Sequence, residues 1–218
     1  MTDHFVVHGA RGAGSVPIEA ALTLMGLPYE VVERPPLKDF EAALAAAAKV
    51  NPMRQIPAVV LPGGELMTES AAILIWLADA YPQAGLAPPS TSPLRPAFLR
   101  WMTFVSAAIY GLYWIRDDPS RMTPDKALEP WLRERTADRI AECWGIMEAQ
   151  VSPGRYLLGD EMSVLDLYVA TISRWGPRRR RFYEVAPRMG EVVRRIDADP
   201  RLAGFWAERF PFSEGWEG

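Results

Sequence analysis

The sequence has 218 residues, of which 49% are hydrophobic, and it carries a formal net charge of −3. That length and apolar content allow one large domain or two small ones, and the slightly acidic balance gives no general attraction to nucleic acid. The single cysteine, Cys143, excludes an intramolecular disulfide, and neither an export signal nor a membrane-length apolar run is recognisable, so we expect a cytoplasmic protein that is not inserted in a membrane.

The first part of the chain alternates between strand and helix patterns. A strand is predicted over residues 5–8, a glycine-rich turn follows, and Val16 to Met25 has a helical pattern that ends at Gly26. Residues 29–33 again have the pattern of a strand. The order predicts a β-α-β opening whose two strands are parallel.

A second helix, a hairpin and a third helix are predicted next. Residues 40–50 are rich in alanine, and Asn51-Pro52 ends this helix because a residue before proline avoids the α conformation. A strand is predicted over 58–61, a tight turn and a short second arm over 62–67, and a helix over 70–80. The resulting order is β-α-β-α-β-β-α.

The rest of the chain is predicted to be helical. Residues 81–93 are rich in proline and have little periodicity, so we predict that they link two domains. Beyond them, apolar residues recur at helical spacing. Helices are predicted over 94–115, 130–150, 163–174, 187–196 and 200–209. The sequence therefore predicts an α/β domain over 1–80 and an all-α domain over 94–218.

A proline directly precedes the predicted strand 58–61, in the segment Gln55-Ile56-Pro57. Because proline cannot donate a hydrogen bond to a sheet, two interpretations stay open: a trans proline at the start of an edge strand, or a cis peptide. A cis bond before Pro57 would turn the N–H and C=O of Ile56 outward, where they could pair with the main chain of an extended peptide.

Glu69 and Ser70 stand where the hairpin leads into the helix predicted over 70–80. Ser70 can cap that helix, and the free N–H groups of a helix start also bind carboxylates. Glu69 could hold an ammonium group. The pair is therefore either a simple capping signal or a site for the zwitterionic head of an amino acid.

Taken in order, the Gln-Ile-Pro segment, the hairpin and the Glu-Ser pair resemble the glutathione-transferase family, and the resemblance covers essentially the whole chain. It implies a thioredoxin-like N-terminal domain that binds glutathione as co-substrate, followed by an all-α C-terminal domain. By the resemblance, Ile56 before a cis Pro57 pairs with the cysteinyl backbone of glutathione. Glu69 and Ser70 would hold its γ-glutamyl end, and Gln55 would reach its glycyl carboxylate.

A second match lies in the helical half. Ser163 and Asp166 have the spacing of a capping box, in which the two residues satisfy each other's backbone donors. In the family this box begins a buried helix of the second domain, so its expected role is structural. We expect Asp166→Ala to lower stability by on the order of 1 to 2 kcal/mol with ligand affinity intact.

The first loop departs from the family pattern. Family members typically place a tyrosine, serine or cysteine there to stabilise the glutathione thiolate, whereas residues 8–14 contain none of these and the usual serine position falls near Gly12. Ser15 is either the activating hydroxyl or a plain N-cap of the following helix. Arg11 is the other catalytic candidate, as a cation near the sulfur or a clamp for an acidic co-substrate. The backbone amides of residues 12–15 are a third source of stabilisation.

Reactive and charged residues outside these motifs are given mainly structural interpretations. Cys143 falls inside the helix predicted over 130–150, so we expect a buried thiol and no glutaredoxin-like chemistry. No grouping of His, Cys and Asp has metal-site spacing, and no metal is expected. The run Arg178-Arg179-Arg180-Arg181 could guide an anionic ligand, but a solvated loop or helix start is the favoured interpretation.

By the resemblance, the acceptor site would lie between the first loop and the helix predicted over 94–115. Tyr110, Tyr113 and Trp114 are the candidate wall residues there, with Arg116 beside them, although aromatic rows at helical spacing are more often core.

Two functions from different classes follow. The leading hypothesis is a glutathione transferase that activates the glutathione thiolate for attack on a small, largely apolar electrophile, as in detoxification. The alternative is a glutathione-transferase-like module that binds ligands or proteins without catalysis. A homodimer is expected from the resemblance.

Overall fold

The computed structural model describes residues 3–35, 40–176 and 179–217 of the chain. Within them, the first part forms a four-stranded mixed sheet in the order β2-β1-β3-β4. The strands are β1 (Phe5–Gly9), β2 (Tyr29–Glu33), β3 (Ala58–Val60) and β4 (Leu66–Thr68). β1 runs parallel to β2 and antiparallel to β3, and β3 runs antiparallel to β4. The predicted β-α-β opening and hairpin are confirmed.

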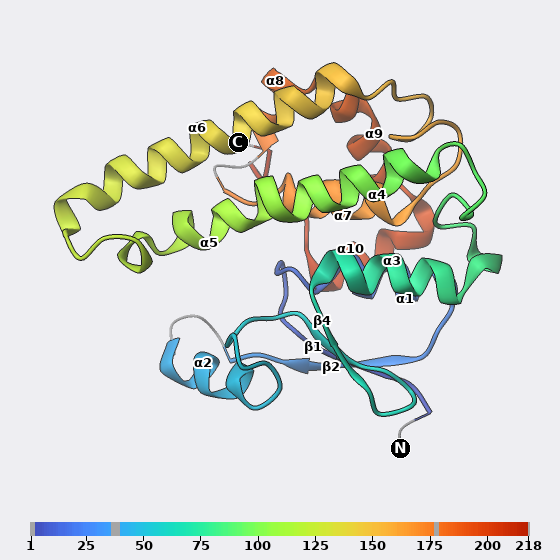
Figure 1. The fold of residues 1–218 in the computed structure, drawn as a ribbon, viewed down its shortest axis with the longest axis horizontal. Helices are drawn as coiled ribbons and strands as arrows, with labels where there is room; N and C mark the ends of the chain where they lie inside the picture. The colour runs from blue at the N-terminus through green and yellow to red at the C-terminus, as the bar shows by residue number, and fades with distance from the viewer. Residues whose placement is uncertain (1–2, 36–39, 177–178, 218) are drawn as a thin grey trace.

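Three helices accompany the sheet: α1 (Val16–Met25), α2 (Phe40–Ala48) and α3 (Ser70–Ala80). Helices α1 and α3 lie between the sheet and the long helices of the second half (Figure 1). α1 ends at Gly26, whose φ of 65° is left-handed and suits glycine. The sheet with its helices is thus the expected thioredoxin-like half of the fold.

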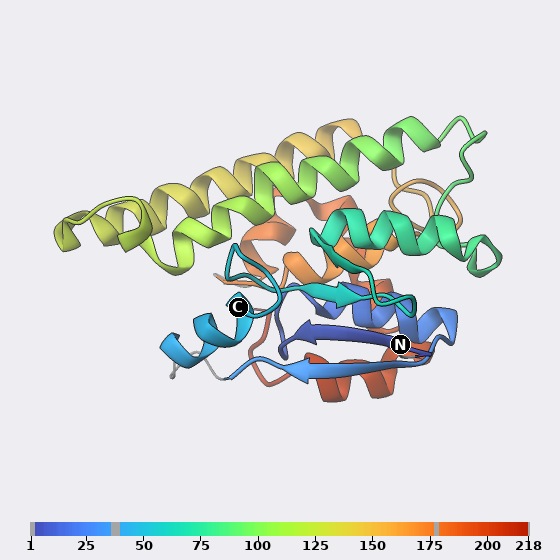
Figure 2. The same ribbon diagram turned by 60° about the horizontal axis from the view of Figure 1, so that its bottom comes forward.

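The remaining described residues are mostly helical, as predicted. The helices are α4 (Arg95–Phe104), α5 (Gly111–Asp117), α6 (Glu129–Gln150), α7 (Val164–Ile172), α8 (Arg179–Val185), α9 (Pro187–Asp197) and α10 (Ala203–Arg209). In both views α4 and α5 form one long rod beside α6 (Figures 1 and 2). None of the helices described is long and apolar enough to cross a bilayer.

The helix predicted over 94–115 is interrupted by a π-helical segment, Val105–Tyr110, between α4 and α5. The apolar spacing of the sequence does not predict this segment, because α-helical and π-helical turns contain the same types of residue. π-helical turns are often found at functional sites. The last residue of this one, Tyr110, is an acceptor-site candidate.

One hydrophobic core joins the two halves. It includes Leu74 from α3, Phe98 from α4 and Tyr168 from α7, all fully buried. The segment 81–93, predicted to be a linker, takes part in it: Leu86 is 4% exposed, and its carbonyl accepts a hydrogen bond from the Val164 N–H at 2.8 Å. Contact across the whole of this core fixes how α1 and α3 meet the helical layer.

Two structural interpretations of the sequence are confirmed. Cys143 is buried, and burial raises the pKa of its thiol, as expected for a core residue. The capping box is also present. Asp166 is fully buried and accepts hydrogen bonds from the Ser163 N–H, the Ser163 hydroxyl and the Leu157 N–H, each at 2.8 Å.

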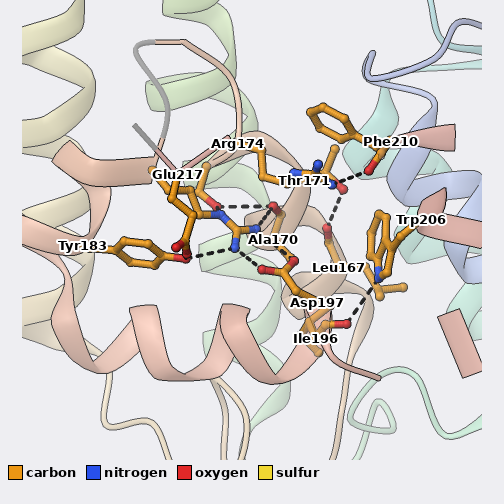
Figure 3. Close-up of polar contacts among 12 residues, drawn as sticks. Leu167, Ala170, Thr171, Arg174, Tyr183, Ile196, Asp197, Trp206, Phe210 and Glu217 are labelled. Atoms are coloured by element: carbon orange, nitrogen blue, oxygen red, sulfur yellow. Dashed lines mark hydrogen bonds and ion pairs between the residues drawn. The ribbon is translucent and has the colours of Figure 1, made fainter. Parts of the chain in front are cut away.

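The arginine run begins a helix, as one of the two favoured interpretations expected, because α8 starts at Arg179. The solvated interpretation is wrong for Arg179, which is fully buried. Its guanidinium pairs with Asp197 and donates to the Ala170 carbonyl, in the cluster around Asp197 that Figure 3 shows. Arg181 pairs with Asp138, and Arg178 lies outside the described residues. The ion pairs of Arg179 and Arg181 therefore join α8 to α9 and α6. A buried arginine such as Arg179 requires a partner of this kind.

Candidate functional site

The sheet topology brings four segments of the chain to one edge. Strands β1 and β2 are parallel, so the residues that follow them, the loop 10–15 and Arg34, lie at the same end of the sheet. Ala58 pairs with His8 on one side and Thr68 on the other, so β3 begins and β4 ends at that edge too. The order along the edge is Arg34, the loop 10–15, Ile56-Pro57 and Glu69-Ser70.

The Ile56-Pro57 peptide bond is cis, so the trans interpretation is wrong. Within the described residues, the N–H and C=O of Ile56 make no hydrogen bond, and both are left for a partner. The buried Asn51 braces this loop, because its side chain donates to the Gln55 carbonyl and accepts from the Met53 N–H, both at 3.0 Å. The sequence analysis missed Asn51, whose position before Pro52 suggested only a helix end.

Glu69 and Ser70 begin α3 in an unusual conformation. Glu69 is exposed and has a φ of 67°, in the left-handed region. Ser70 is buried, and its hydroxyl forms a 2.8 Å hydrogen bond with the Tyr168 hydroxyl of α7. The prediction that Ser70 caps the helix is therefore wrong, since its side chain makes no capping bond. Burial raises the pKa of Tyr168 to about 12, so this phenol stays protonated at neutral pH.

The hydroxyl of Ser15 is used inside the first loop. Ser15 is fully buried, and its Oγ accepts from the Ala10 N–H at 3.1 Å and donates to the Ala10 carbonyl at 3.3 Å. It makes no capping bond to α1. The loop is closed by this side chain, and the catalytic role of Ser15 stays a prediction.

Gly12, at the usual serine position, is enclosed by residues from the far end of the chain. Its carbonyl accepts a hydrogen bond from the Trp175 indole at 2.7 Å, and its N–H donates to the Arg209 carbonyl at 2.9 Å. Its φ is +67°, and a β-carbon there would meet the Phe210 ring at 3.3 Å. A side chain at this position would be strained by both effects.

Arg11 is exposed and lines a different cleft, of about 640 Å³, between β2, α1 and α10. Tyr29, Glu33 and Phe205 are among the other residues of this cleft, whereas Ile56, Glu69 and Tyr110 are not. Arg11 thus borders a cleft that these candidate glutathione-binding residues do not line.

An aromatic cluster covers the first loop from the helical side. The Trp175 ring lies 4.8 Å from Tyr110 and 5.1 Å from Tyr113, measured between centroids. Trp114 does not join them: it is 42% exposed and stacks on the Arg121 guanidinium at 4.9 Å. Trp175 was missed by the sequence analysis, and only its side-chain contacts reveal it.

The chain is similar to known proteins in sequence and in fold. Residues 15–80 match the family model described as "Glutathione S-transferase, N-terminal domain". The Escherichia coli K12 "Uncharacterized GST-like protein YncG" is 28% identical over 90% of this chain and 94% of its own length. The chain belongs to the glutathione S-transferase superfamily. A zeta-class glutathione S-transferase of Euphorbia esula is 27% identical, over 73% of this chain and 69% of that protein.

The fold of this superfamily member is also found in solved structures. A glutathione transferase homologue from Sulfitobacter, crystallised with bound glutathione, superposes with a TM-score of 0.80 at 22% identity, covering 94% of this chain and 97% of that one. The matched stretch 15–80 contains Ile56-Pro57 and Glu69-Ser70. Tyr110 and Trp175 lie outside it.

Proposed function

We propose that this superfamily member is a glutathione transferase, which binds glutathione along the sheet edge and presents its thiolate to a small, largely apolar electrophile. The observation that supports this most is the Ile56 backbone, whose N–H and C=O are both unpaired beside the cis Pro57 within the described residues. An extended peptide adds to such an edge through main-chain hydrogen bonds.

Each end of glutathione has a candidate partner along this edge. The cysteinyl backbone would pair with Ile56, and the carboxylate of Glu69 would hold the γ-glutamyl ammonium. The α-carboxylate would bind at the start of α3 near Ser70, where free N–H groups and the helix dipole favour an anion. Gln55 would reach the glycyl carboxylate. Glu69 is exposed and Gln55 half-buried, so both side chains are accessible to a ligand.

Catalysis requires that bound glutathione lose its thiol proton, because a free thiol with a pKa near 8.5 is only a few per cent ionised at neutral pH. Ser15, Arg11 and the loop amides are the predicted sources of stabilisation, and the acceptor would lie against Tyr110 and Tyr113. Tyr113 is 4% exposed, so it would support the wall from behind, and the exposed Trp114 would contribute only at the rim.

The glutathione site can be tested by titration calorimetry. We expect wild-type protein to bind glutathione and Glu69→Gln to bind it about 10 to 100 times more weakly, since a charge-assisted hydrogen bond contributes about 1.5 to 3 kcal/mol. Glu65→Gln is the matched control, because it removes the same charge from an exposed position in the same hairpin. Equal affinities of the two variants would contradict the proposed site.

Turnover separates an enzyme from a binding module. Conjugation of glutathione to a panel of small aromatic electrophiles by wild-type protein is expected. Glutathione binding without any turnover would favour the non-catalytic alternative. We further propose that the protein is a cytoplasmic homodimer with a detoxifying role. Light scattering of the purified protein would test the homodimer, because it gives the mass of the particle.

A further inference from the structure

The hydroxyl of Tyr110 is held against the first loop without a hydrogen-bond partner. A β-carbon added to Gly14 would lie 1.9 Å from this oxygen, so the hydroxyl rests on the backbone just before α1. The ring is fixed between Trp175, 4.8 Å away, and Tyr168, 6.4 Å away. Among the described residues no group bonds to the oxygen. A phenol O–H is therefore positioned at the start of α1 and left free to donate.

A partly buried positive charge, Arg34, lies at the same end of the sheet. The backbone N–H of Arg34 donates to the Gly9 carbonyl at 2.7 Å, which holds Arg34 beside the end of β1. Its side chain is half-buried, and its Nε is buried and unpaired within the described residues. Arg34 and Tyr110 interact electrostatically, while Glu69 acts on Tyr110 with the opposite sign. The unpaired guanidinium N–H of Arg34 and the free hydroxyl of Tyr110 lie at the same end of the sheet, where both can donate to an anion.

The order of segments along the edge indicates which anion this is. With the γ-glutamyl end at Glu69-Ser70 and the cysteinyl backbone on Ile56, the next segment along the edge is the loop 10–15, and Arg34 lies beyond it. The cysteine side chain of glutathione would thus extend toward the loop that Tyr110 covers. In that loop Gly12 has no side chain, and the Ser15 hydroxyl is already bonded to Ala10.

We propose that Tyr110 donates a hydrogen bond to the sulfur of bound glutathione and that Arg34 supplies the positive charge that favours its thiolate form. The inference rests on the proposed function, because it takes the glutathione pose from it. In this step the S–H bond breaks, the electron pair stays on sulfur and the proton leaves to water. The sulfur then forms a C–S bond to the acceptor, and the displaced pair leaves with the leaving group or takes up a proton.

The state of each group is consistent with its role. Burial raises the pKa of Tyr110 well above the usual range, so the phenol remains protonated and acts only as a donor. Tyr110 closes the π-helical segment Val105–Tyr110, in which Ser106 bonds to Tyr168. The same segment therefore positions the free hydroxyl of Tyr110 and supports the Tyr168 that holds Ser70.

The test measures the ultraviolet absorption of the bound thiolate against pH, together with the glutathione Kd by calorimetry. For Tyr110→Phe and for Arg34→Gln we expect the apparent pKa of the bound thiol to rise by about one unit, a tenfold smaller thiolate fraction below that pKa. At a pH below the pKa of the bound thiol, where glutathione is bound as the thiol, the Kd should change less than about threefold. Arg100→Gln, on the exposed side of α4, controls for the loss of a positive charge and should leave the thiol pKa unchanged.

The outcomes separate the two proposals. A thiol pKa that is unchanged in Tyr110→Phe and Arg34→Gln, while wild-type protein binds glutathione, would overturn this inference alone. The same holds if Ser15→Ala or Arg11→Gln raises the thiol pKa and Tyr110→Phe does not. No binding of glutathione by the wild-type protein would overturn both proposals.

Discussion

The two sides of the candidate site are built in different ways. The side proposed for the glutathione backbone comes from one stretch of chain, Asn51 to Ser70, whose hairpin carries it across the sheet edge. The side proposed for the sulfur combines Gly12, Arg34, Tyr110 and Trp175, which are far apart in sequence. Local motifs can specify the first side, whereas only packing of the helical half against the loop creates the second.

Helix α7 contacts both sides of the site, so a change in this helix should affect the two sides together. Its Tyr168 bonds to Ser70 on the glutathione side, and Trp175, just beyond its end, bonds to Gly12 on the sulfur side. The helix begins at the Ser163–Asp166 box, which is fully buried. Loss of the box should therefore lower the stability of the whole fold and distinguish neither side.

The largest effect is expected for Asp166→Ala. It leaves the buried N–H groups of Ser163 and Leu157 without an acceptor, so we expect the free energy of unfolding at neutral pH to fall by about 3 kcal/mol, more than the loss of about 1 to 2 kcal/mol expected from the sequence for removal of a cap alone. Urea unfolding gives this value, and Asp160→Ala, an exposed carboxylate nearby, is the control. Glutathione affinity of the folded protein should be unchanged. A stable variant that has lost binding would show that the box belongs to the site.

The difference in unfolding free energy between wild type and Asp166→Ala should depend on pH. Burial raises the pKa of Asp166 to about 6, above its unfolded value, so the protonated carboxyl stabilises the fold at low pH and this contribution is lost as pH rises through about 6. The stability difference between wild type and Asp166→Ala should therefore widen by about 2 kcal/mol from about pH 7 to about pH 4.5. A difference that narrows toward acid would contradict it.

A smaller effect, on the sulfur side, is expected when the usual family serine is restored. Gly12→Ser places a side chain at φ +67° and against Phe210, so stability should fall by about 1 to 2 kcal/mol. The thiolate fraction of bound glutathione should not increase. Gly63→Ser, where an added β-carbon meets nothing within 4 Å, is the matched control. A stable Gly12→Ser protein with more thiolate would show that the loop still accepts the family arrangement.

The smallest effect is expected on the glutathione side. Asn51→Ala removes the two side-chain hydrogen bonds that brace the loop before Pro57. Because the Ile56 backbone would be less well oriented, glutathione should bind about fivefold more weakly, or about 1 kcal/mol. Calorimetry measures this, and the absorption spectrum should show an unchanged pKa of the bound thiol. A shift of the thiol pKa without a change in Kd would mean that the two sides are not separable.

Sequence by itself determined the order of elements, the sheet and the capping box. The helix boundaries Val16–Met25 and Ser70–Ala80 agree with prediction, because proline, glycine and apolar periodicity act over a few residues. The segments Ile56-Pro57 and Glu69-Ser70 were found in the same way, as residue types in a fixed local order. These two segments meet at one edge because β3 and β4 pair as a hairpin, so the segments are also close in sequence.

Tertiary structure alone decided what individual side chains do. Ser15 is turned inward to Ala10, Arg179 is buried against Asp197, and Tyr110 reaches Gly14 from the helical half. Each outcome depends on which way a side chain points, and the π-helical segment before Gly111 changes that direction without changing the pattern of residues. Contacts such as Gly12 with Trp175, separated by most of the chain, arise only when the core is packed.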